Sequence, residues 1–405
     1  MKKYSGILCF LLAMLMVMGM FAACGKTPEN EPVADPTESV PATEPVVEEN
    51  NFEKDKAEYD AMTAEQLVEK YVADPANMTI AEYADLLATY AFVEIEDGSF
   101  TTYNKSKDAI DICKDAGSKL PKSSESELAT IMAAKPYANS RAYYYCLLAN
   151  FIVPKDSEGY NALKEQYKKE TDPFVIACVI RGLSTTFGED ADFCKFALSY
   201  ADSDNYDARL RLAMTLNDYQ AVDKEEVVQA ALTLLADKEG DIAYYTAEEC
   251  GALADDRFVE PIKALLADMD KVSVHSHAAK GLIRMWYNGK TSEAAYNATM
   301  DYLKAENTDP KYPAWSALTL FTSPKSGAYD DWKAEATYFN EKDLVDVMKG
   351  LVADAEAEKL IKTNAVKVIG AFGTADDLNE LKPLVETSPD KDAIIAEIDK
   401  QLEAK

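Results

Sequence analysis

The chain has 405 residues, a formal net charge of −29 at pH 7 and a sequence pI near 4.5. This acidity argues against nucleic acid as a partner, because affinity for the phosphate backbone comes from lysine and arginine, and against electrostatic docking on anionic lipid. The length exceeds what one compact core needs, so several domains or an array of repeats is expected.

The first residues predict export. A pair of lysines precedes residues 7–21, an apolar run too short to cross about 30 Å of hydrocarbon but suited to a signal-peptide core. The run ends in Phe21-Ala22-Ala23-Cys24-Gly25, which resembles the lipobox of bacterial lipoproteins, although Phe21 stands where that family usually has an aliphatic residue. The resemblance implies a signal peptide at 1–23 and lipidation of Cys24. The alternative is an ordinary secretory signal cleaved nearby.

Two or more acyl chains anchor a protein stably, so a lipid on Cys24 would hold the chain on the extracytoplasmic face of a bacterial cell membrane. From Gly25 to Asn51 there are five prolines and seven acidic residues against one lysine. Such a segment buries too little apolar surface to fold. Residues 24–51 are therefore predicted to be a disordered, extended linker.

Helical periodicity begins near Ala57, and no later segment shows sustained strand-like alternation, so the body is predicted to be all-α. Residues 52–139 are predicted to form an N-terminal helical cap. Its expected helices cover 63–73, 79–92, 101–116 and 123–134, and residues 93–100 form either a long loop or a short hairpin.

Residues 140–405 are predicted to be an α-solenoid of stacked antiparallel helix hairpins. Thr171-Asp172-Pro173 supplies an N-cap acceptor and a proline for the first helical position, and Thr308-Asp309-Pro310 repeats it. The spacings along the series Asp172, Asp207, Asp241, His275 and Asp309 are 35, 34, 34 and 34 residues. Each unit carries apolar stripes that one hairpin cannot cover alone, so neighbouring units must stack.

The repeats resemble the HEAT-like family. Val274–Leu282, Val175–Leu183 and Ile361–Ile369 fit the family's turn and first helix. The family's arginine is missing, because the matching positions hold Ile176, His275 and Lys362. The resemblance implies a right-handed solenoid with an extended binding surface. A tetratricopeptide-like array and a closed ring of helix hairpins are the alternatives.

Little in the sequence predicts catalysis. The only histidines, His275 and His277, are two residues apart and would point in different directions on a helix. Residues 202–207 resemble the opening of a calcium loop, but they lack the glycine that its sharp turn needs and favour a helix cap. We predict no catalytic residue, no metal site and no cofactor.

Seven cysteines become five once Cys9 and Cys24 are set aside, and none of the five forms a C-x-x-C motif. They lie among apolar or small residues in predicted helices, where a free thiol behaves as a small hydrophobe. A bridge between Cys178 and Cys194 on neighbouring helices is geometrically conceivable. The five are Cys113, Cys146, Cys178, Cys194 and Cys250.

Aromatic residues crowd the region from 286 to 339. Most are expected to fill wedges between helices, but Trp and Tyr also suit hot spots for a partner. Candidate partner-binding residues are Trp286, Trp315, Tyr329 and Trp332. Trp332 and Tyr329 lie in an inserted stretch and are the first candidates for exposure.

These features predict a membrane-anchored extracytoplasmic lipoprotein whose HEAT-like scaffold binds a protein or peptide partner and does not catalyse a reaction. The alternative is an α/α-toroid carbohydrate-active enzyme or a glycan-binding lipoprotein. A passive structural lipoprotein is a third possibility.

Overall fold

The computed structural model describes residues 51–93, 95–96, 99–100, 104–120, 125–150, 152–287, 291–304 and 328–405. This part of the chain is all-α apart from one two-stranded ladder, and successive helices stack in a solenoid-like manner, as the sequence predicts. The predicted signal peptide, linker residues 24–50 and the repeat start at Asp309 lie outside the described residues.

The chain divides into two compact units. The N-terminal unit is Met1–Cys194 with Asp204–Leu212, and the C-terminal unit is Lys195–Ser203 with Ala213–Lys405. The division between the units therefore falls near residue 200. The two helices that cross this division are α11 (Ala191–Leu198) and α12 (Tyr206–Ala213).

The N-terminal unit contains the expected helices, with boundaries shifted by a few residues. Within the predicted loop or hairpin, residues 95–96 pair antiparallel with residues 99–100, and Ile95 lies opposite Phe100. The elements are α2 (Phe52–Ala61), α3 (Ala64–Tyr71), α4 (Ile80–Ala88), η2 (Thr89–Phe92), β1 (Ile95–Glu96), β2 (Ser99–Phe100), α5 (Lys105–Ile112), α6 (Lys114–Gly117), α7 (Glu125–Ala133), α8 (Ala138–Leu148), α9 (Glu158–Tyr167) and α10 (Pro173–Phe187).

Side-chain caps explain where these helices begin. Thr63 and Thr79 form reciprocal capping boxes with Gln66 and Glu82, and each box satisfies two backbone N–H groups that the helix leaves unpaired. Asp172 caps α10 by accepting hydrogen bonds from the backbone N–H groups of its first turn, and Pro173 follows it. The predicted start signal at 171–173 is confirmed.

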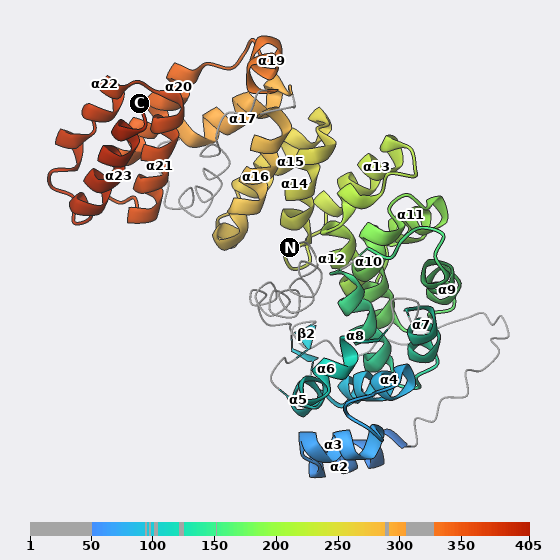
Figure 1. The fold of residues 1–405 in the computed structure, drawn as a ribbon. Helices are drawn as coiled ribbons and strands as arrows, with labels where there is room; N and C mark the ends of the chain where they lie inside the picture. Colours follow the sequence, from blue (N-terminus) through green and yellow to red (C-terminus); the bar gives the residue numbers. More distant parts are fainter. Residues whose placement is uncertain are drawn as a thin grey trace. The chain divides into compact units, whose positions relative to one another are not determined.

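Helices α8 and α10 approach each other very closely in the N-terminal unit (Figure 1). A Cβ atom placed on Gly182 of α10 would lie 2.1 Å from the carbonyl oxygen of Tyr145 on α8. Only glycine fits at this crossing, because any side chain would collide with rigid backbone.

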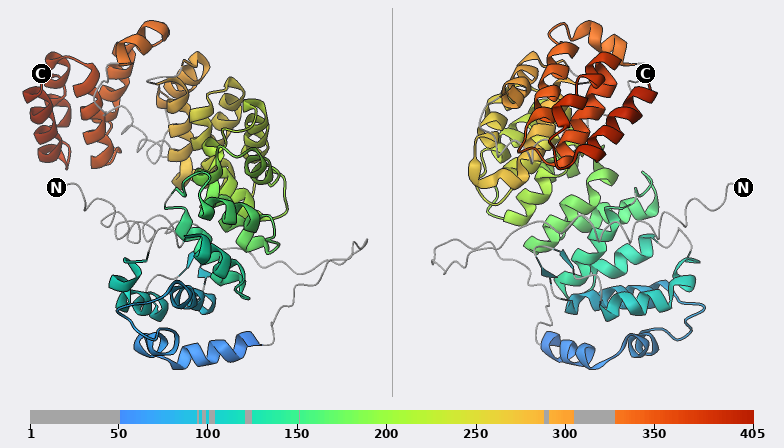
Figure 2. Two further views of the ribbon diagram at one scale, coloured as in Figure 1. Left: turned by 45° about the vertical axis from the view of Figure 1, so that its right-hand side comes forward. Right: turned by 90° about the vertical axis from the view of Figure 1, so that its left-hand side faces the viewer.

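The C-terminal unit continues the stacking. Helix α14 packs on α16, and α21 packs on both α20 and α23. The orange-to-red helices of the C-terminal end lie side by side in Figure 2. The elements are η4 (Leu216–Asp218), α13 (Lys224–Leu235), α14 (Ile242–Leu253), η5 (Asp256–Phe258), α15 (Val259–Leu266), η6 (Met269–Val274), α16 (His275–Trp286), α17 (Glu293–Lys304), α19 (Ala328–Glu335), α20 (Glu341–Ala353), α21 (Lys359–Phe372), α22 (Ala375–Asn379), η8 (Lys382–Val385) and α23 (Lys391–Glu403).

The predicted period of about 34 residues corresponds to successive helix starts. Asp172 and Asp241 occupy the N-cap positions of α10 and α14, and His275 is the first residue of α16. Asn205 lies at the start of α12, where its side-chain oxygen accepts a hydrogen bond from the N–H of Ala208. The acidic run at 202–207 thus contains a helix cap, as its sequence favours.

Candidate functional site

Two of the candidate partner-binding residues are core residues. Trp286 and Trp332 are 0% and 4% exposed, so the expectation that Trp332 is exposed for binding is wrong. The Trp332 indole N–H donates to the backbone carbonyl of Trp286 at 3.1 Å, and the Trp286 indole N–H donates to Thr299 at 3.0 Å. Tyr329 lies in α19, and Trp315 and Cys24 lie outside the described residues.

The indole of Trp332 is buried because it completes the end of a helix. The last carbonyls of an α-helix have no partner within the helix and must find one elsewhere. Trp286 is the last residue of α16, and the Tyr338 hydroxyl also donates to its carbonyl, at 3.3 Å. The aromatic cluster around Trp286 is therefore a structural cap for α16.

The two histidines face different surroundings, as their spacing predicts. His275 is fully buried, and its Nε2 lies 2.8 Å from the carbonyl oxygen of Asp268. His277 is half-buried, and its Nδ1 donates to Glu248 at 2.6 Å. Among the residues that the structure describes, no group of three or more His, Cys, Asp or Glu side chains could hold a metal ion.

A polar surface on two adjacent helices is the best-formed candidate site. We define the α14–α16 polar face as Tyr245, Glu248 and Glu249 of α14 with His277, Lys280 and Arg284 of α16. Residues three and four apart share one side of a helix, and all six are half-buried or exposed. The opposite sides of both helices are buried in the core of the unit.

Small residues bring the two helices together beneath this face. A Cβ atom on Gly281 of α16 would lie 2.0 Å from the carbonyl oxygen of Ala247 on α14. A Cβ atom on Gly251 would meet the Cβ of Arg284 at 2.5 Å and the carbonyl oxygen of Gly281 at 3.1 Å. The close backbone approach places charged side chains of both helices within direct reach of one another.

Glu248 is the centre of the face. Its carboxylate accepts a hydrogen bond from His277 at 2.6 Å and forms an ion pair with Arg284 at 2.9 Å, and the Lys280 ammonium lies 3.7 Å away. Burial alone would raise the pKa of this carboxyl, but the hydrogen bond from His277 and the neighbouring positive charges outweigh burial and lower it. Glu248 is therefore held as a carboxylate within a cluster of basic groups.

The pKa of the adjacent Glu249 shifts in the opposite direction. Burial, followed by repulsion from Asp218 and Glu248, raises the pKa of Glu249 to about 7. The side-chain amide of Asn217 donates a hydrogen bond to this carboxyl and offsets only part of the rise. The face therefore carries one carboxyl that is firmly ionised and one that changes charge near neutral pH.

We expect Glu249→Gln to stabilise the protein at alkaline pH. Between pH 4.5 and about 7 the folded protein holds a proton on Glu249 that the unfolded chain has lost, so this group's contribution to stability falls as pH rises through that window. Well above pH 7 the glutamine variant should gain about 3 kcal/mol in the free energy of unfolding, with no gain near pH 4.5. Urea unfolding of both proteins across this range measures the difference. Glu226→Gln, at an exposed position of α13, should gain at neither pH.

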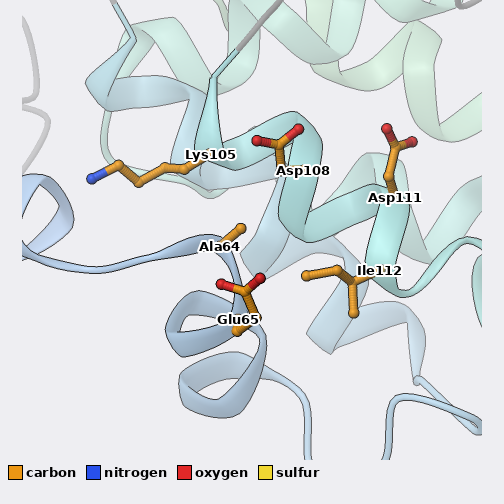
Figure 3. Close-up of a pocket in the computed structure, with 6 residues that line it drawn as sticks. All are labelled: Ala64, Glu65, Lys105, Asp108, Asp111 and Ile112. Atoms are coloured by element: carbon orange, nitrogen blue, oxygen red, sulfur yellow. The ribbon is translucent and has the colours of Figure 1, made fainter.

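The N-terminal unit has an open groove between α3 and α5, with a volume of about 530 Å³. It is lined by Ala64, Glu65, Lys105, Asp108, Asp111 and Ile112 (Figure 3). The Lys105 ammonium donates to the carbonyls of Tyr59 and Asp60, so it caps the C-terminal end of α2. Asp108 and Asp111 point away from Ile112 and Glu65 in Figure 3. The groove therefore brings no charged groups together in the way the α14–α16 polar face does.

No protein-family model matches the chain, and no curated protein is significantly similar to it. The class of protein therefore rests on the described fold, which is an all-α, solenoid-like array of helices. None of the described helices combines the length and the apolar character needed to cross a membrane.

Sequence reasoning missed the α14–α16 polar face. One signal was present, because Lys280 and Arg284 form a basic i, i+4 pair in a chain with 71 acidic and 42 basic residues. Their acidic partner Glu248 lies on the preceding repeat, however, and helical periodicity within one segment does not reveal contacts across repeats.

Proposed function

We propose that the protein is an exported lipoprotein, anchored through a lipid on Cys24 to the extracytoplasmic face of a bacterial cell membrane. We propose further that its HEAT-like scaffold binds a protein or peptide partner and does not catalyse a reaction. The anchor is supported by the resemblance of residues 21–25 to a lipobox. The binding role is supported by the α14–α16 polar face.

The observation that carries the binding proposal is the cluster of basic groups around Glu248. Arg284 keeps 42% of its side chain exposed while it contacts Glu248, and it has more N–H donors than this one contact uses. Lys280, at 3.7 Å, is beyond ordinary hydrogen-bond distance from the same carboxylate. Both cations are therefore available to a second carboxylate.

The chemistry of the face favours a peptide segment that presents an acidic side chain. Such a carboxylate could bind Arg284 and Lys280 beside Glu248 without a change in the backbone. Tyr245, whose ring centroid lies 4.8 Å from that of His277, provides an aromatic flank for the apolar part of the segment. Arginine and tyrosine are the residue types that most often dominate binding energy at interfaces.

We expect Arg284→Ala to weaken partner capture roughly tenfold or more, because it removes the most exposed cation of the face. The variant keeps the Cβ atom that packs against Gly251, so the close contact of α14 with α16 is preserved. Crosslinking in the native envelope, followed by quantification of the captured protein, measures the effect. Lys263→Ala on α15, a half-exposed lysine paired with Glu260, is the matched control. Equal capture by both variants would contradict the proposal.

The anchor has a separate test. Cys24→Ser should abolish incorporation of a labelled fatty acid into the protein, because the thiol that would carry the lipid is gone. Cells grown with the label are lysed, and the protein is captured and measured for bound label. Cys113→Ser, which alters a buried thiol, should leave labelling unchanged. Labelling of the Cys24 variant at the unaltered level would exclude the lipobox assignment.

A further inference from the structure

We propose that Cys146 and Cys178 form a reversible disulfide that links α8 to α10. Both are free thiols in the structure, and their side chains are hydrogen-bonded to each other across the two helices. They belong to the N-terminal unit, whereas the proposed partner-binding face belongs to the C-terminal unit. Formation of the disulfide depends on the proximity of the two thiols. Its occurrence in the cell also rests on the proposed export, because disulfides persist in oxidising compartments.

The close crossing of α8 and α10 makes the bond possible. Cys146 follows Tyr145, whose carbonyl faces Gly182, and Cys178 lies one helical turn before Gly182. A disulfide needs Cβ atoms about 3.5–4.5 Å apart, which neighbouring helices reach only where small residues let the backbones approach. Since the two thiols already form a hydrogen bond, side-chain rotation can bring the sulfurs together without rebuilding either helix.

The two thiols have different environments, which assigns their roles. Cys146 is half-buried, whereas Cys178 is buried. The hydrogen bond from Cys178, together with the charges of Arg211 and Arg181, lowers the pKa of Cys146 despite burial. The same hydrogen bond and burial raise the pKa of Cys178. Cys146 is thus the attacking thiolate, and Cys178 is the resolving thiol.

The other cysteines are placed differently. The bridge between Cys178 and Cys194 that the sequence left open is not present. The Cys194 thiol points instead at the backbone of the α10 terminus, 3.2 Å from the carbonyl oxygen of Gly188 and 3.9 Å from that of Phe187. Cys113 and Cys250 are buried, and burial raises the pKa of both. Cys146 is therefore the only half-buried thiol in the described residues.

The oxidation proceeds by thiol–disulfide exchange with a small-molecule disulfide or the disulfide of an oxidase. The Cys146 thiolate attacks one sulfur of the oxidant, which forms a mixed disulfide and releases the first thiolate. Cys178 gives up its proton and attacks the Cys146 sulfur, which closes the intramolecular bond and releases the second thiolate. Overall, two protein thiols become one disulfide, and one oxidant disulfide becomes two thiols.

The test uses the full chain, reduced and then incubated with oxidised glutathione. Non-reducing peptide mapping should find one crosslink, joining the peptides that contain Cys146 and Cys178, and dithiothreitol should reverse it. Cys194→Ser should keep this crosslink. Cys178→Ser should instead accumulate a mixed disulfide of glutathione with Cys146, because the resolving thiol is missing.

A second measurement needs no variant. In the native, reduced protein, iodoacetamide should alkylate Cys146 roughly tenfold or more faster than Cys194, because alkylation follows thiolate content and exposure. A crosslink between Cys178 and Cys194, a random mixture of crosslinks, or equal alkylation of Cys146 and Cys194 would each overturn the proposal. None of these outcomes depends on partner binding, so this proposal and the binding proposal fail independently.

Discussion

Trp332→Ala is expected to lower the free energy of unfolding of the C-terminal unit by about 3–5 kcal/mol, the usual cost of removing a buried tryptophan side chain. The indole packs against Trp286, Tyr287 and Phe339, with ring centroids 6.4, 5.3 and 5.3 Å away. Its removal leaves a cavity among rigid rings and takes away a side-chain donor to the last carbonyl of α16. Urea unfolding followed by circular dichroism measures the loss.

Trp332→Phe separates the contribution of the indole hydrogen bond from that of the buried ring, and Leu360→Ala is the surface control. Trp332→Phe keeps much of the ring volume but removes the indole N–H, so it should cost about 1–3 kcal/mol. Leu360→Ala alters a side chain that is 60% exposed in the same unit and should change stability by less than about 0.5 kcal/mol. If Trp332→Ala is as stable as Leu360→Ala, the indole is not part of the core.

The burial of Trp332 decides which residues can be used to test binding. A surface hot spot loses affinity and keeps its stability when truncated, whereas a core residue loses stability first. Loss of partner capture by a Trp332 variant would therefore reflect unfolding. Arg284 and Lys280 provide variants whose side chains do not fill the core.

Local patterns were enough to predict the class of fold and many helix starts. Thr63 and Thr79 are each followed by Gln or Glu three residues later, and Asp172 precedes a proline, so the caps are encoded within a few residues. The regular spacing of helix starts also came directly from the sequence, because each repeat restarts with a similar signal.

Contacts across repeats could not be predicted in the same way. Trp332 is buried because a carbonyl 46 residues earlier accepts its N–H, and Glu248 is ionised because His277, 29 residues later, donates to it. The Cys178 thiol interacts with Cys146 and not with Cys194, because Gly182 lets α8 and α10 cross closely. Each outcome depends on which turns of two helices meet, and amphipathic periodicity does not specify this.

Gly281→Ala is expected to cost about 3 kcal/mol or more, at the upper end of the range for overpacked interiors. The new methyl group would lie 2.0 Å from the Ala247 carbonyl oxygen, which belongs to rigid helical backbone and cannot rotate away. Helices α14 and α16 would have to separate, and the separation would also lengthen the contacts of Glu248 with His277 and Arg284. We therefore expect loss of partner capture together with loss of stability.

Gly350→Ala provides the matched control, because it makes the same chemical change on α20 of the same unit. Nothing lies within 4 Å of a Cβ atom at Gly350, so the methyl group adds no collision. Alanine also has less conformational freedom to lose than glycine, so this variant should gain about 0.5–1 kcal/mol. Opposite signs for the two substitutions would show that helix proximity, and not helix propensity, makes glycine necessary at 281. If both variants gained stability, α14 and α16 would not pack closely, and the polar face would lose the contact that holds it together.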